Sequence, residues 1–117
     1  MELGRDGCLL RILIGEGSKH KGKPLFEWLV LRARELGLAG ATVTRGVMGF
    51  GANSRIHTAK ILRLSEDLPI VIEIVDSREK IERYLNTVEG FIEGGLATIE
   101  KADVRFYRCS NSKGCPV

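Results

Sequence analysis

The sequence predicts one α+β domain whose elements follow in the order strand, helix, strand, strand, helix, strand. Short apolar runs bounded by glycine and polar residues are interrupted by two stretches in which apolar residues recur at helical spacing. The chain has 117 residues, of which 44% are apolar and 28% are charged, as in an ordinary soluble domain with one core. This order is the split βαβ arrangement of ferredoxin-like domains, a four-stranded antiparallel sheet with two helices on one face.

The first half of the chain supplies two strands and one helix. Residues 9–14 form a nearly continuous apolar run, and the glycine-containing turn at residues 15–18 ends it. Pro24 suits the first turn of a helix, and the apolar residues after it keep helical spacing until Gly37. Residues 41–48 alternate between small or apolar and polar side chains, which predicts a half-exposed strand.

The second half repeats the pattern in the order strand, helix, strand. Residues 68–75 are a second apolar run, and Asp76 and Glu79 have the spacing of a capping box at the start of a helix. The apolar stripe of that helix consists of Ile81, Tyr84, Leu85, Val88, Phe91 and Ile92. Gly94 and Gly95 are expected to terminate the helix, and residues 97–107 to form the last strand.

The two ends of the chain are expected to lie outside the packed domain. We assign residues 1–7 to a flexible N-terminus, 8–108 to the domain and 109–117 to a disordered tail. No stretch approaches the roughly 20 apolar residues that cross a bilayer, and the first residues lack the order of a signal peptide. We therefore expect a cytoplasmic protein without membrane insertion.

Metal binding and nucleophilic catalysis have little support in the sequence. Cys8, Cys109 and Cys115 are an odd number near the two ends, which is a poor disulfide framework and lacks zinc-site spacing. We expect Cys109 and Cys115 to be inert, with a redox-sensitive pair as the alternative. His57 has no second His, Cys or carboxylate pair in its segment, so we expect no catalytic residues and no metal.

The excess of positive charge is local. The whole chain carries 18 basic and 15 acidic residues, a net charge of +3. Residues 45–63 contain four basic residues and no acidic one, so this window carries +4, while the remaining 14 basic and 15 acidic residues sum to −1. The mild overall excess argues against a duplex-binding protein, and the two central strands carry no aromatic side chain with which to stack RNA bases. We expect no nucleic-acid partner.

A glycine-rich segment follows the second strand inside this basic window. Its candidate ligand-binding residues are Arg45, Gly46, Gly49, Phe50, Gly51, Arg55 and His57. Glycines let backbone amides approach an anion, and guanidinium groups beside them suit a phosphate. No Gly-Lys-Ser or Gly-Lys-Thr of a phosphate-binding Walker loop is present. The alternative is a glycine-rich hairpin arm with solvated charges. Phe50 either stacks on a base or packs at a subunit interface.

Two further basic groups are candidates for the same ligand. Lys23 belongs to the basic cluster at residues 19–23, which lies where the first helix begins and its backbone amides are free. This cluster either assists the glycine-rich segment or is a solvated turn. Arg105 and Arg108 in the last strand are either edge charges or reach the loop of a neighbouring subunit.

The predicted sheet has one face that the helices leave uncovered. In this topology the first and third strands lie in the centre, and both are apolar on two faces. An apolar surface of that size normally indicates association, so we expect a homo-oligomer. Arg11 and Glu73 interrupt this face on adjacent strands, and we expect them to pair inside the oligomer. The alternative is a solvated sheet face.

Four segments together carry a family resemblance. The sequences GKPL at residues 22–25, GATVTRGVMGFG at 40–51, IHT at 56–58 and LSEDLPIVIEIVD at 64–76 resemble the uncharacterised PII-like family of bacteria and archaea. The resemblance extends over residues 8–108. It implies a ferredoxin-like fold assembled as a trimer whose sheets face inward.

The resemblance also implies a function. Relatives in the wider superfamily bind adenine nucleotides between subunits and regulate other proteins through the loop after the second strand. We therefore expect a non-enzymatic regulator with AMP, ADP or ATP as effector, no other cofactor, and an unidentified target protein, for which a membrane transporter is one candidate. The expected nucleotide-binding residues are Lys23, Arg45, Gly46, Gly49, Phe50, Gly51, Arg55, His57 and Arg105. A structural trimer and a small phosphohydrolase on the same fold are the alternatives.

Overall fold

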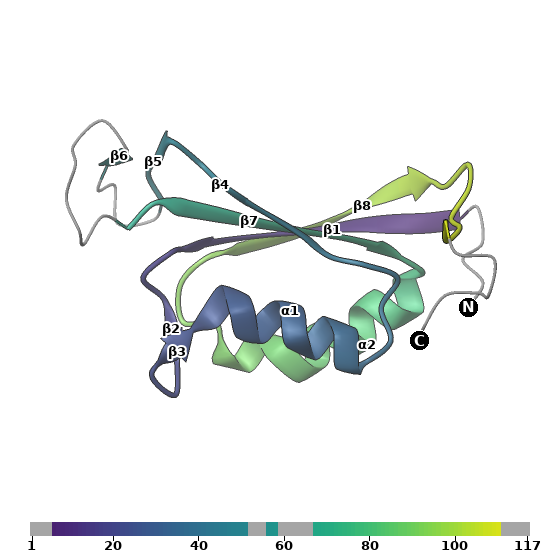
Figure 1. The fold of residues 1–117 in the computed structure, drawn as a ribbon, viewed down its shortest axis with the longest axis horizontal. Coiled ribbons are helices and arrows are strands. Elements are labelled where there is room, and N and C mark those ends of the chain that lie inside the picture. The colour runs from purple at the N-terminus through teal and green to yellow at the C-terminus, as the bar shows by residue number, and fades with distance from the viewer. Residues whose placement is uncertain (1–5, 52–55, 59–66, 111–117) are drawn as a thin grey trace.

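The computed structural model describes residues 6–51, 56–58 and 67–110 and confirms the ferredoxin-like fold. The sheet is antiparallel, with strand order β4–β7–β1–β8. Its strands are β1 (Asp6–Gly15), β4 (Thr42–Arg45), β7 (Pro69–Asp76) and β8 (Leu96–Asp103). The helices α1 (Leu25–Glu35) and α2 (Arg78–Val88) both lie on one face of this sheet (Figure 1).

The two central strands have the two-sided pattern that the sequence predicts. Successive side chains of a strand point to opposite faces, so the even-numbered residues of β1 and β7 face the helices. Their buried apolar side chains are Leu10, Ile12, Ile14, Ile70, Ile72 and Ile74. The odd-numbered residues from Leu9 to Leu13 and from Val71 to Val75 are half-buried and form the centre of the open face.

The first helix ends where the sequence predicts. Gly37 has a φ of 76°, which favours glycine, and its N–H donates to the carbonyl of Arg34. The N–H of Leu38 donates to the carbonyl of Ala33, which completes a Schellman motif, and both of these apolar residues are buried. At the other end, Pro24 precedes the helix as its N-cap residue and is not in the first turn.

The expected capping box of the second helix is wrong. Ser77 is the N-cap residue, and its hydroxyl accepts a hydrogen bond from the N–H of Lys80 at 3.3 Å. Asp76 is the last residue of β7 and points to the buried face. Its carboxylate accepts from the N–H of Ala39 at 2.8 Å and from that of Ser77 at 2.6 Å. Asp76 therefore joins the end of β7 to the segment that follows α1.

The second helix and the last strand are both shorter than expected. α2 ends at Val88 and continues as the 3₁₀ turn η1 (Glu89–Phe91). β8 ends at Asp103, and the next residues leave the sheet, where the hydroxyl of Tyr107 donates to the carbonyl of Ala39 at 2.7 Å. Within the helical layer, the buried hydroxyl of Tyr84 donates to the carbonyl of Leu29 at 2.8 Å and joins α2 to α1.

Two small hairpins extend from the same end of the sandwich (Figure 1). Strands β2 (Lys19–His20) and β3 (Lys23–Pro24) form one hairpin. Strands β5 (Met48–Gly49) and β6 (His57–Thr58) form the other, so the predicted strand at residues 41–48 is divided, and only β4 belongs to the main sheet. We call residues 46–51 and 56–58 the arm.

The described helices are too short and too polar to cross a bilayer. Cys8 is a buried free thiol. Cys109 is disulfide-bonded, which contradicts the expectation that it is inert, and Cys115 lies outside the described residues.

Candidate functional site

The candidate site lies at the end of the sheet where the arm begins. The last residue of β1, Gly15, stands opposite the first residue of β7, Pro69, and the last residue of β4, Arg45, stands opposite Ile70. The turn at residues 15–18 is fixed to this end, since the N–H of Glu16 donates to the carbonyl of Leu68 at 2.8 Å. Strand pairing thus brings three segments that are distant in sequence to one place.

Arg45 is paired with a carboxylate that sequence reasoning did not select. Its guanidinium forms an ion pair with Glu16, whose side chain is 26% exposed, while that of Arg45 is 56% exposed. A second carboxylate lies beside the same turn, because Asp67 accepts a hydrogen bond from the N–H of Gly17. The predicted cation is therefore present where the arm begins, together with two acidic side chains. We call Arg45 and the adjoining turn at residues 15–18 the arm root.

Gly46 and Gly49 lie against the ring of Pro69. A Cβ atom built on Gly46 would come within 2.8 Å of Pro69 Cγ, and one built on Gly49 within 3.1 Å. The N–H of Gly46 donates to the carbonyl of Pro69 at 2.7 Å. It is therefore not available to a ligand, contrary to the expectation that the backbone amides of this segment approach an anion. Gly46 is explained by this close approach of two backbone segments.

The arm itself presents apolar side chains to solvent. Gly51 has open space around it, and Phe50 is 71% exposed. The other large exposed apolar residues of the arm are Val47, Met48 and Ile56. His57 lies in β6 opposite Gly49, and Arg55 lies outside the described residues.

Lys23 lies on the hairpin beside the helices. The two turn residues of this hairpin, Lys21 and Gly22, have positive φ values, as in the two-residue turns that join antiparallel strands. The hairpin packs on the helical layer through His20, whose ring lies 4.3 Å from that of Trp28 and 4.9 Å from that of Phe91. The structure thus places Lys23 in the layer of the helices, whereas Arg45 ends a strand of the sheet.

Arg105 lies at the opposite end of the sheet from Arg45. Ile14 of β1 is level with Arg45, and Asp6 of β1 is level with Asp103, the last residue of β8. Ile14 and Asp6 are eight residues apart, which is roughly 26 Å at about 3.3 Å per residue. One chain therefore does not bring Arg105 to the arm.

An open cleft of about 570 Å³ lies on the uncovered face of the sheet, from its middle toward that opposite end. Its walls are the strands β1 and β7, the segment before β4 and the segment after β8. The cleft is lined by Leu9, Ala39, Gly40, Ala41, Thr42, Glu73, Val75, Val104, Phe106 and Tyr107. This cleft has no local signal in the sequence, because one wall is the segment after β8, where the Tyr107 hydroxyl donates to the carbonyl of Ala39.

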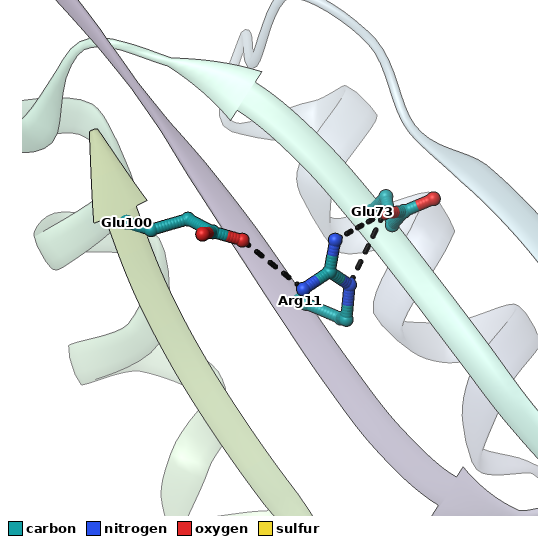
Figure 2. Close-up of polar contacts among 3 residues, drawn as sticks. All are labelled: Arg11, Glu73 and Glu100. Atoms are coloured by element: carbon teal, nitrogen blue, oxygen red, sulfur yellow. Dashed lines mark hydrogen bonds and ion pairs between the residues drawn. The ribbon is translucent and has the colours of Figure 1, made fainter. Parts of the chain in front are cut away.

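A row of charges crosses the middle of the open face. Arg11 stands opposite Glu73 in the register of β1 and β7, and its guanidinium donates to that carboxylate at 3.1 and 3.2 Å, which confirms the predicted pair. On its other side the guanidinium donates to the carboxylate of Glu100 at 3.1 Å (Figure 2). The hydrogen bond with Glu73 is the main cause that raises the pKa of Arg11 above its ordinary value. Among the described residues, no group of three or more His, Cys, Asp or Glu side chains is placed to hold a metal ion.

Comparison with known proteins identifies the family. Residues 7–104 match the family DUF190, described as "Uncharacterized ACR, COG1993". The chain belongs to this family. A UPF0166 protein of Aquifex aeolicus is 43% identical over 96 residues, which are 82% of this chain and 90% of that protein. A UPF0166 protein of Methanocaldococcus jannaschii is 36% identical over 77 residues, which are 66% of this chain and 70% of that protein. The family therefore occurs in bacteria and archaea.

A solved structure relates the fold of the family to PII-like proteins. It is CPII, a nitrogen regulatory PII-like protein from Thiomonas intermedia K12, bound to ADP, AMP and bicarbonate. The two structures have a TM-score of 0.66 at 20% sequence identity, over 85% of this chain and 88% of that one. This similarity confirms the PII-like fold that the resemblance in the sequence implies.

Proposed function

We propose that this protein is a regulatory trimer that binds an adenine nucleotide between its subunits and controls a partner protein through the arm. The observation that carries the proposal is the similarity of its fold to CPII, a regulatory protein with ADP and AMP bound. The arm root adds the guanidinium of Arg45, a group that suits a phosphate, at the start of the glycine-containing arm.

The proposed position of the nucleotide between subunits combines the cleft with the arm. A nucleotide needs an apolar slot for its base and a cation for its phosphates. The cleft supplies the slot, with Leu9 and Val75 as apolar walls and Thr42 as a hydrogen-bonding side chain, and the arm root supplies Arg45. Within one chain Thr42 in the cleft lies three residues before Arg45 in β4, roughly 10 Å at about 3.3 Å per residue. We assign the cleft of one copy and the arm of its neighbour to one nucleotide because the resemblance to the PII-like family implies a site between subunits.

The open face of the sheet supports the assembly. Leu9 stands opposite Val75 and Leu13 opposite Val71, so apolar pairs flank the charged row on both sides. An apolar surface of this kind favours association, and the resemblance to the PII-like family makes three copies the expected number. In the trimer the row around Arg11 is shielded from water, where its pairing with Glu73 offsets the cost of burial.

The arm is the surface proposed for the partner. Val47 and Phe50 are 75% and 71% exposed, and Arg45 precedes them in the chain. A ligand at the arm root changes the arm only as far as it binds one of its arrangements more tightly than the other. The unidentified target, for which a membrane transporter is one candidate, would then bind one arrangement of the arm.

Calorimetry with AMP, ADP and ATP tests the proposal. We expect Arg45→Ala to weaken binding of the tightest nucleotide about tenfold or more, as for the loss of a charge-assisted hydrogen bond. The matched control is Arg83→Ala, which removes an exposed arginine that pairs with Glu79 on α2. No binding of any of the three nucleotides at millimolar concentration would refute the proposal and leave a structural trimer.

Mixing two variants, each of which impairs a different half of the proposed site, tests whether the site lies between subunits. Arg45→Ala removes the cation at the arm root, and Thr42→Arg fills the cleft. In random trimers refolded from equal amounts of both, roughly a quarter of the sites combine an intact arm with an intact cleft from a neighbour. Recovery of that fraction supports a shared site, whereas no recovery places the whole site in one chain. Light scattering during size-exclusion chromatography measures the number of copies.

A further inference from the structure

The ion pair between Glu16 and Arg45 has a consequence for any anion that binds at the arm root. A phosphate needs the same guanidinium that Glu16 already occupies. The carboxylate of Asp67 lies on the neighbouring Gly17, which adds a second negative charge at this end. A phosphate therefore has to displace Glu16 or share Arg45 with it, against repulsion from both carboxylates.

Glu16 contacts both the end of β4 and the residue before β7. Its side chain binds Arg45, the last residue before the arm, and its own N–H donates to the carbonyl of Leu68, two residues before Ile70 in β7. The turn that carries it is closed by the N–H of Ser18, which donates to the carbonyl of Gly15 at 3.2 Å. Release of the side chain thus removes the ion pair that holds Arg45, at the start of the arm, to this turn, while the backbone of Glu16 stays bonded to Leu68.

We propose that Glu16 is an intramolecular competitor for the nucleotide phosphate: it holds Arg45 in the ligand-free protein, lowers the affinity for the ligand, and is released when phosphate binds. This inference rests on the proposed function. It names the residue that sets the affinity of the site and the contact that couples ligand binding to the arm.

Calorimetry with adenosine, AMP, ADP and ATP on the full chain tests the competition. We expect Glu16→Gln to bind the phosphate-containing nucleotides about three- to tenfold more tightly, with a smaller gain at high salt, because a partly exposed ion pair is removed. The affinity for adenosine should stay unchanged. Glu16→Asp keeps the charge and should bind like the wild type. Trp28 fluorescence and the melting temperature check that each variant is folded.

Two further variants separate the ion pair from other effects. Glu35→Gln is the matched control, since Glu35 pairs with Arg32 on the exposed side of α1 at 2.5 Å, and it should not change the affinity. Asp67→Asn removes the other carboxylate without touching Arg45, and it should produce a smaller gain than Glu16→Gln. An equal gain would show that the summed negative charge at the arm root lowers the affinity, and not the ion pair between Glu16 and Arg45. That result would overturn the inference.

The outcomes distinguish the inference from the proposed function. Equal or weaker nucleotide binding by Glu16→Gln, with binding by the wild type, overturns the competition and leaves the proposed function intact. An equal gain for adenosine also overturns it. No binding by either protein overturns both. Binding by Glu16→Gln where the wild type shows none supports both.

Discussion

The substitution Gly46→Ala measures how strongly the arm root depends on a close backbone approach. A methyl group on Gly46 would lie 2.8 Å from Pro69 Cγ, closer than carbon atoms pack, and a proline ring cannot rotate away as a flexible side chain can. Relief requires the two segments to separate, which lengthens the 2.7 Å hydrogen bond from Gly46 N–H to the carbonyl of Pro69. Losing that bond costs about 1 kcal/mol, and overpacking about 1–3 kcal/mol. Gly46 is half-buried at the edge of the fold, so we expect the lower end, about 2 kcal/mol in total.

Urea unfolding at one fixed protein concentration measures this cost, because association makes stability depend on concentration. The chain has a single tryptophan, Trp28, which packs against His20 and Phe91 and reports unfolding by its fluorescence. Gly51→Ala is the matched control. It has nothing within 4 Å of the added methyl group and should change the free energy of unfolding by less than about 0.5 kcal/mol.

A double-mutant cycle identifies the contact responsible. Pro69→Ala removes the Cγ atom and leaves its own Cβ, which is 3.5 Å from the methyl group of Ala at position 46, an ordinary contact. In this background Gly46→Ala should therefore cost less than about 1 kcal/mol. The explanation is refuted if Gly46→Ala is as stable as the wild type, or if its cost is the same with and without the proline ring.

Two other predictions concern the packing that supports the site. Tyr84→Phe should cost about 1 kcal/mol at neutral pH, because it removes the hydrogen bond to Leu29. Burial raises the pKa of Tyr84 above its value in the unfolded chain, so the folded state keeps a proton that the unfolded state releases above about pH 10. The wild type should thus lose about 1.4 kcal/mol per pH unit in that range, and urea titrations should show a shallower slope for Tyr84→Phe. Ser77→Ala should cost about 1 kcal/mol of unfolding free energy, because the helix loses its cap. Asp76→Ala should cost about 2–4 kcal/mol, because two backbone amides lose their acceptor. Equal costs in thermal unfolding would contradict the assignment of Ser77 as the cap.

The elements of the fold could be predicted because their signals are local. The apolar runs of β1 and β7 and the stop at Gly37 are visible in a few consecutive residues. The cap of α2 was misplaced because Asp76 and Ser77 are both good N-cap residues, and the choice depends on where the strand ends. The alternation of β7 predicts the correct assignment, since it places Asp76 in the strand, on the same buried face as Ile72 and Ile74.

Contacts within the sheet could be predicted only where the register was evident. Arg11 and Glu73 interrupt two central strands of similar length, so their pairing follows from the topology. Glu100 was missed because β8 has a weak apolar pattern and ends at Asp103, before the expected boundary, which left its register unknown. The cleft was missed for a related reason, since its outer wall is a segment without regular structure that a single hydroxyl of Tyr107 attaches to the fold.

The candidate site shows a limit of reasoning from local charge. Arg45 opens a window of +4 in the sequence, but its partner Glu16 lies 29 residues earlier, in a turn outside the window. The turn at residues 15–18 and the end of β4 meet only because both β1 and β4 pair with β7. The affinity of the arm root for phosphate therefore depends on how much more strongly the guanidinium of Arg45 binds the incoming anion than it binds the carboxylate of Glu16. The affinity is lower than an unpaired arginine would give. Since both partners are anions, added salt should screen each of them, and the affinity should depend less on salt than an unpaired arginine would predict.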